Sequence, residues 1–114
     1  MNKIQVTTVF TRFSESNKFY QTSTDDVQYI RDTYIKTGKI LKRESYMSSD
    51  KMAKTVVTHF ASTDAWNEFS ADPVQLKIIQ DRNELNVQNN IRTSLIMQEY
   101  NDDGIVNSET RTIT

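Results

Sequence analysis

The order of hydrophobic patterns along the chain limits the folds that it can adopt. From Ile4 to Phe10, β-branched or aromatic residues recur at every second position, which is typical of a strand. The runs KILKRESYM (39–47) and MAKTVVTHFA (52–61) are also strand-like, and the polar sequence SSDK between them predicts a β-hairpin. The run RTSLIMQEY (92–100) predicts a last strand.

Two segments between these strands have helical spacing. In the first, Thr24 or Asp25 can cap a helix that carries Val27, Ile30 and Tyr34 on one face, and Gly38 closes it. The second begins at Ser62 or Thr63, with Ala65, Trp66 and Phe69 on one face.

This second helical segment is expected to bend after Ala71. Asp72 can cap a new helix with Pro73 at its first position, where the missing N–H costs nothing. Gln75 stands three residues after Asp72 and would complete a capping box. Val74, Ile78 and Leu85 form the apolar stripe expected for this helix.

The resulting order, βαββαβ, predicts an α+β fold of the ferredoxin-like type. In that arrangement, two helices cover one face of a four-stranded antiparallel sheet. We expect a single domain over residues 1–100 and a polar tail over 101–114, in which Ile105 and Val106 allow a short extra strand. The segment KFYQT (18–22) is compatible with a short strand or an ordered loop.

Several strands carry apolar residues on both faces, as in Val56-Val57 and Leu95-Ile96-Met97. A strand that is apolar on both sides needs cover on both sides, and two helices on one face cannot supply it. We therefore expect a homodimer or a larger assembly formed through the open sheet face. The interface candidates are Val57, Leu95 and Met97.

Composition excludes several classes of function. With no cysteine, the chain has no disulfide, no thiolate nucleophile and no cysteine metal site. The net charge is −1 and no basic run occurs, so nucleic acid is not an expected partner. No apolar run approaches the ~18 residues of a membrane span, and the alternating N-terminus is unlike a signal peptide, so membrane insertion and signal-peptide secretion are not expected.

Candidate site residues are few. His59 is the single histidine, so a multi-histidine metal site is excluded, and we expect neither a metal nor a cofactor. His59 could act as a general base, although a solvated strand histidine is the simpler interpretation. Trp66 could stack on a flat ligand or anchor the core, and Tyr46 could contact a ligand or solvent. Arg43 and Tyr46 should face opposite sides of their strand.

The segment VVTHFASTDAWNEFSADP (56–73), with its strand, capped helix and bend, resembles the dimeric α+β barrel superfamily, which includes antibiotic-biosynthesis-monooxygenase-like proteins. The likeness covers roughly residues 3–100. It implies, as one hypothesis, a small cofactor-independent monooxygenase-like enzyme that binds an apolar ligand near Tyr46, His59 and Trp66. Haem-degrading members use a histidine on the second helix, and PVQLKIIQDRNEL here has none, which argues against haem binding in their manner.

A second likeness rests on three segments, VTTVFTRF, DTYIKTGK and TVVTHFASTDAWNEFSADP. Together they resemble small uncharacterised proteins of tailed marine phages. This resemblance implies a non-catalytic structural or protein-interaction module, either a virion component or a phage–host interaction protein. Its partners would be its own copies and other virion or host proteins, in the virion or the host cytoplasm. At the sequence level this module is the preferred hypothesis, and the enzyme is the alternative.

Overall fold

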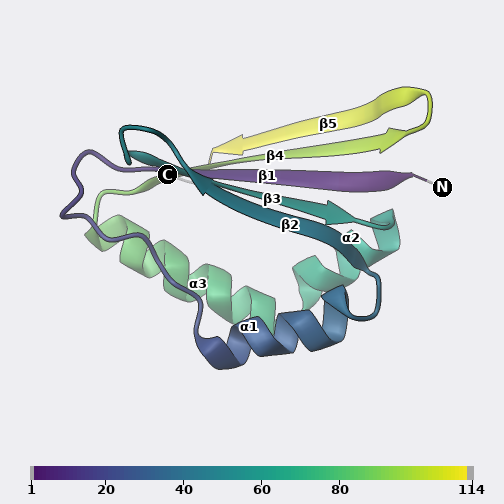
Figure 1. Cartoon of the computed structure of the whole chain (residues 1–114), viewed down its shortest axis with the longest axis horizontal. Coiled ribbons are helices and arrows are strands. Elements are labelled where there is room, and N and C mark those ends of the chain that lie inside the picture. Colours follow the sequence, from purple (N-terminus) through teal and green to yellow (C-terminus); the bar gives the residue numbers. More distant parts are fainter. Residues whose placement is uncertain (1, 113–114) are drawn as a thin grey trace.

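The computed structural model describes residues 2–112 and shows an α+β fold with one sheet and one layer of helices. The strands are β1 (Lys3–Thr11), β2 (Ile40–Met47), β3 (Ala53–Phe60), β4 (Arg92–Asn101) and β5 (Gly104–Thr112). The sheet is antiparallel, with the strand order β2-β3-β1-β4-β5. The helices lie together on one side of the sheet (Figure 1).

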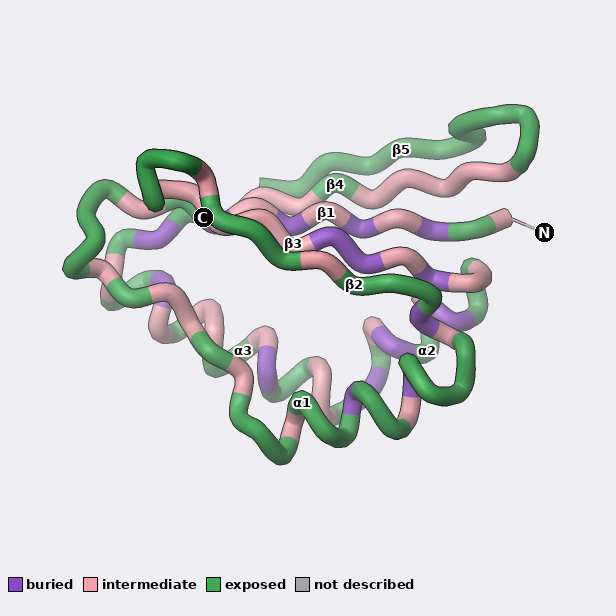
Figure 2. Tube along the Cα trace, viewed as in Figure 1, coloured by how far each residue is buried: buried purple, intermediate pink, exposed green. Residues whose placement is uncertain are grey.

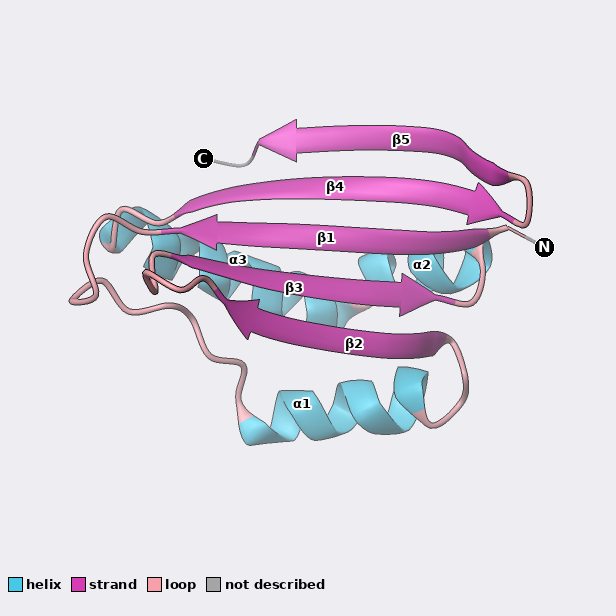
Figure 3. Ribbon diagram, turned by 45° about the horizontal axis from the view of Figure 1, so that its top comes forward, coloured by secondary structure: helices cyan, strands magenta, loops and turns pink. Residues whose placement is uncertain are grey.

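The structure departs from the four-stranded ferredoxin-like prediction in two ways. Gly104–Thr112 form β5, a longer strand than the short one that Ile105 and Val106 allow, and it pairs along β4 at the edge of the sheet (Figure 3). The helical layer also has three helices where two were expected. We therefore describe the fold as a five-stranded antiparallel sheet with helices on one face.

The first helical segment begins at α1 (Thr24–Ile30) and continues without a break as a π-helical turn, η1 (Arg31–Ile35). Its N-cap is Ser23, one residue before the predicted cap, and the Ser23 hydroxyl accepts a hydrogen bond from the Asp26 N–H. Gly38 follows this segment with a φ of 80°, which confirms the expected left-handed ending. Residues 18–22 form no strand and belong to the connection between β1 and α1.

The break in the second helical segment is confirmed. In α2 (Thr63–Ala71), Ser62 accepts a hydrogen bond from the Ala65 N–H. Asp72 then caps α3 (Pro73–Gln88) by accepting from the Val74 N–H at 2.8 Å. None of the helices within residues 2–112 is long and apolar enough to cross a membrane.

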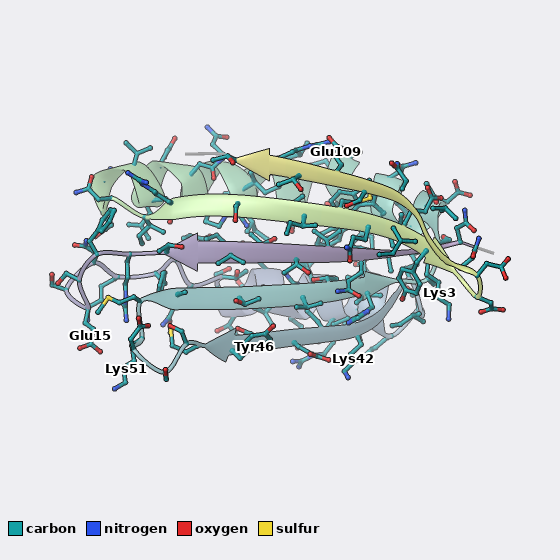
Figure 4. All side chains as sticks on the ribbon, turned by 90° about the horizontal axis from the view of Figure 1, so that it is seen from above. Lys3, Glu15, Lys42, Tyr46, Lys51 and Glu109 are labelled. Carbon is teal, nitrogen blue, oxygen red and sulfur yellow. The ribbon has the colours of Figure 1, made fainter. Side chains whose placement is uncertain are left out.

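The core lies between the sheet and the helices. In β1, burial alternates residue by residue (Figure 2), and the buried set is Ile4, Val6, Thr8 and Phe10. The strand register carries this inward face across the sheet, because Ile4 pairs with Phe60 and Val6 pairs with Met97. No described helix covers the opposite face, which we call the open face (Figure 4).

Candidate functional site

A cavity of about 150 Å³ lies between the inward face of the sheet and the helices. Its floor comes from β1, β2, β3 and β4, and its roof from α1, α2, α3 and the connection before α1. Because its lining combines residues of the sheet with residues of α1, α2 and α3, we take this cavity as the candidate functional site.

One wall of the cavity is aromatic. Phe60 lies at the centre of this wall, with the rings of Trp66 and Phe69 each 5.3 Å away, centroid to centroid. Phe60 and Phe69 are buried, whereas Trp66 is half-buried. Such rings give a flat or branched apolar molecule extensive contact at low entropic cost.

Another part of the cavity lining, which we call the basic side, carries positive charge. Three cationic side chains line it: Arg43 on β2, Lys54 on β3 and Arg82 on α3. Among the described residues, the lining contains no aspartate or glutamate, and none of the three cations forms an ion pair. The lining of the cavity therefore combines an aromatic wall with uncompensated positive charge.

Arg82 is held by an aromatic ring instead of by an acid. Its guanidinium carbon lies 5.0 Å from the centroid of Phe10, a cation–π geometry. Its Nε is buried and has no hydrogen-bond partner among the described residues. Burial lowers the pKa of Arg82, and the positive charge of Arg43 lowers it further.

Arg43 reaches the cavity because of a β-bulge. The register between β2 and β3 shifts between Ile40 and Lys42, so that Ile40 and Arg43 both face the helices although they are an odd number of positions apart. Desolvation by surrounding protein atoms lowers the pKa of Arg43, while its surface as a whole remains exposed.

Two further polar groups point to the same region. Tyr20, on the connection before α1, lines the cavity and packs against the core. Burial raises the pKa of Tyr20, the charges of Asp81 and Asp26 raise it further, and the nearby charge of Arg82 acts in the opposite direction. Gln75 also lines the cavity, and its Oε1 is buried without a partner. The predicted capping box therefore does not form through this oxygen.

Helix α3 presents these groups as one stripe. Gln75, Ile78, Ile79 and Arg82 all line the cavity, at the spacing i, i+3, i+4 and i+7 of one helical face. The predicted stripe of Val74, Ile78 and Leu85 shares Ile78 with it. The sequence analysis missed Gln75 and Arg82 as cavity residues because it followed apolar side chains alone. Their helical spacing from Ile78 and Ile79 would have placed them on the same face.

The helices that roof the cavity are joined by a buried carboxylate. Asp72 accepts hydrogen bonds from the hydroxyls of Tyr34, at 2.5 Å, and Tyr29, at 2.8 Å. Burial acts to raise the pKa of Asp72, but these hydrogen bonds and those from backbone N–H groups outweigh it and hold the pKa below its ordinary value. Burial, together with the bond to Asp72, raises the pKa of Tyr34.

The three residues that the sequence suggested as ligand contacts do not lie together in the structure. Trp66 lines the cavity. Tyr46 and His59 belong to the open face instead, because His59 pairs with Gln5 and Tyr46 with Thr55, on the side of the sheet opposite Val6 and Phe10. Tyr46 is visible from that side in Figure 4. As expected, Arg43 faces the other way.

His59 has charged neighbours on the open face. Lys42 pairs with His59 across the strands, and its ammonium lies 2.6 Å from the Glu44 carboxylate. The bond from Lys42 lowers the pKa of Glu44, and His59 adds a smaller effect in the same direction. Within residues 2–112, no group of three or more histidine, aspartate or glutamate side chains could hold a metal ion.

The interface candidates also divide between the two faces. Val57 faces the open side, because it pairs with Thr7. Leu95 and Met97 face the helices, since they pair with Thr8 and Val6, and both pack against the core. The expectation that Leu95 and Met97 lie on the open face is therefore wrong, and Ile96 occupies that side of β4.

Comparison with solved structures shows similarity of fold. A conserved protein of unknown function from Bacteroides thetaiotaomicron, described as a possible oxidoreductase, aligns over 85% of this chain and 97% of its own, with a TM-score of 0.58 and 12% identity. Rv0793 from Mycobacterium tuberculosis aligns over 98% of this chain and 93% of its own, with a TM-score of 0.48 and 11% identity. No protein-family model matches the chain. No curated protein matches it either.

Proposed function

We propose that this protein binds a small, mostly apolar molecule in the cavity between the sheet and the helices. The observation that carries the proposal is a hollow lined by aromatic side chains, into which a few polar groups converge. Ligand sites commonly combine an apolar lining with a small number of placed polar groups. A volume of 150 Å³ suits a ligand about the size of a substituted benzene ring.

The test is calorimetric titration with benzyl alcohol, on the protein and on two variants. Val56 lines the cavity, so Val56→Phe should fill part of it and abolish binding. Thr55 precedes it on the same strand and faces the open side, so Thr55→Phe is the matched control and should bind as the parent does. Equal binding by both variants would place the ligand elsewhere and contradict the proposal.

We also propose that the chain forms a homodimer through the open face, as in a dimeric α+β barrel. What supports this is the apolar centre of that face, where Val9, Val57 and Ile96 lie on three adjacent strands with no described element over them; Ile96 is exposed, Val9 is half-buried and Val57 is buried. An uncovered patch of this kind often marks an interaction surface. Roles in a virion, in phage–host contact or in monooxygenase-like chemistry stay predictions from the sequence.

A further inference from the structure

We propose that the ligand of the cavity is a carboxylate with a compact apolar body. The carboxylate lies between Arg43 and Arg82, and the body lies against Phe60 and Trp66. This inference rests on the proposed function, and it adds the charge and the orientation of the ligand.

The first argument is that the positive charges of the basic side repel one another when no anion is bound. Arg43 and Arg82 are near enough for one charge to act on the other, and protein atoms desolvate both. Arg82 is half-buried and Arg43 keeps an exposed surface, so the cost is mutual repulsion in a partly desolvated site, which a bound anion would relieve. No described acidic side chain forms an ion pair with either arginine, so the compensating group is absent from the described chain.

The nearby acidic residues do not fill this role. Asp26 and Asp81 act electrostatically on Tyr20, but neither lines the cavity. Asp81 precedes Arg82 on α3 and is exposed. The described chain therefore leaves a bound anion free to approach the two guanidinium groups without competition from an acidic side chain of the lining.

The second argument is the geometry of the donors. A guanidinium offers N–H groups in a planar fork that matches the two oxygens of a carboxylate. The stack on Phe10 limits the orientation of the Arg82 guanidinium, and its buried Nε–H is an unused donor. Tyr20 supplies a hydroxyl in the same lining. These donors come from β2, α3 and the connection before α1, so three separate elements converge on one anion.

The third argument is the contrast between the two sides of the cavity. The aromatic wall has no charged member, whereas the basic side has three. A carboxylate with an aromatic or branched aliphatic body matches both sides at once. An inorganic anion would leave the aromatic wall without contact, and a neutral apolar molecule would leave the arginines without a counter-charge.

The experiment compares benzoate with benzyl alcohol, which has a similar size and no charge, by calorimetry at one low ionic strength. We expect benzoate to bind at least tenfold more tightly, because its carboxylate can accept charge-assisted hydrogen bonds from the two guanidinium groups and benzyl alcohol has no charge. Arg82→Gln and Arg43→Gln should each reduce benzoate affinity about tenfold and leave benzyl alcohol affinity unchanged. Arg31→Gln is the matched control, because Arg31 is exposed and does not line the cavity.

The outcomes separate the two proposals. Equal affinity for benzoate and benzyl alcohol would overturn the carboxylate inference and leave the binding function standing. Binding of inorganic phosphate more tightly than benzoate would also overturn it, because the aromatic wall would then have no part. If neither aromatic probe binds, the proposed function fails and the inference fails with it.

Discussion

At the residue scale, Asp72 has the largest number of partners of any described carboxylate. It caps α3 and accepts hydrogen bonds from Tyr29 in α1 and Tyr34 in η1, so it joins the first helical segment to α3. Removing it would leave two hydroxyls and a helix N-terminus without their acceptor. A cap contributes about 0.5–2 kcal/mol, and a buried polar group left unpaired costs about 1–3 kcal/mol.

We expect Asp72→Ala to lower the free energy of unfolding by about 2–4 kcal/mol, measured by urea denaturation. Asp64→Ala is the control, since Asp64 is an exposed carboxylate in the first turn of α2. A loss at Asp72 no larger than the loss at Asp64 would show that the tyrosine bonds contribute nothing.

Asp72 also predicts a dependence of stability on pH. Its pKa is lowered in the folded protein, so its stabilising contribution is present above the unfolded value of roughly 3.9 and is lost as the pH falls through the folded value. Asp72→Asn keeps a side chain that can cap the helix and removes the charge. The stability difference between the parent and Asp72→Asn should therefore be constant at neutral pH and shrink below about pH 4. A difference that grows on acidification would contradict this assignment.

At the scale of the element, helix ends and strand faces decide what reaches the cavity. The first helical segment ends at Gly38, whose φ of 80° suits glycine, and nothing lies within 4 Å of where a Cβ would stand. The cost of a side chain at this position is therefore conformational, without a steric clash. A substitution at Gly38 therefore measures the free energy of the backbone conformation alone.

Gly38→Ala should lower the free energy of unfolding by about 1–2 kcal/mol, because alanine is strained in the left-handed region. Gly38→Asn should cost less, since asparagine visits that region more readily. The measurement is the urea midpoint of the three proteins. An alanine variant as stable as the parent, or an asparagine variant less stable than alanine, would be inconsistent with the observed φ.

Sequence periodicity predicted the strands from β1 to β4 and the break at Asp72, because period and capping are local properties of the chain. It did not predict which face of β4 turns inward. Because Leu95, Ile96 and Met97 are consecutive and all apolar, only the pairing of β4 with β1 determines which of them face the helices. The bulge in β2 that turns Arg43 inward is also set by pairing. The inward position of Arg43 therefore depends on long-range register, which local pattern does not contain, whereas the position of Arg82 follows from helical spacing on α3.

At the scale of the whole molecule, the helices leave one face of the sheet open. That face is mixed in character: Val9, Val57 and Ile96 lie at its centre, and polar residues such as Gln5 and Gln98 surround them. The cavity lies on the other face. Self-association and ligand binding can therefore be tested independently.

We expect the native mass to be that of a dimer, and Ile96→Lys to yield a monomer that remains folded, because Ile96 points to the open face. Leu95→Lys is the contrasting variant and should destabilise the fold, since Leu95 packs against the core. The measurements are native mass spectrometry and circular dichroism. A parent protein that is monomeric at all concentrations, or an Ile96→Lys variant that stays dimeric, would rule out the open face as the interface.

The central claim is that the cavity between sheet and helices holds a small ligand, and mapping by ¹H–¹⁵N NMR during a benzoate titration tests it most directly. The account predicts saturable shifts of the Trp66 indole N–H, the Arg82 Nε–H and the amides near Val56, with His59 and Tyr46 unaffected. Shifts confined to the open face around His59 and Tyr46, or no saturable shifts at all, would contradict it.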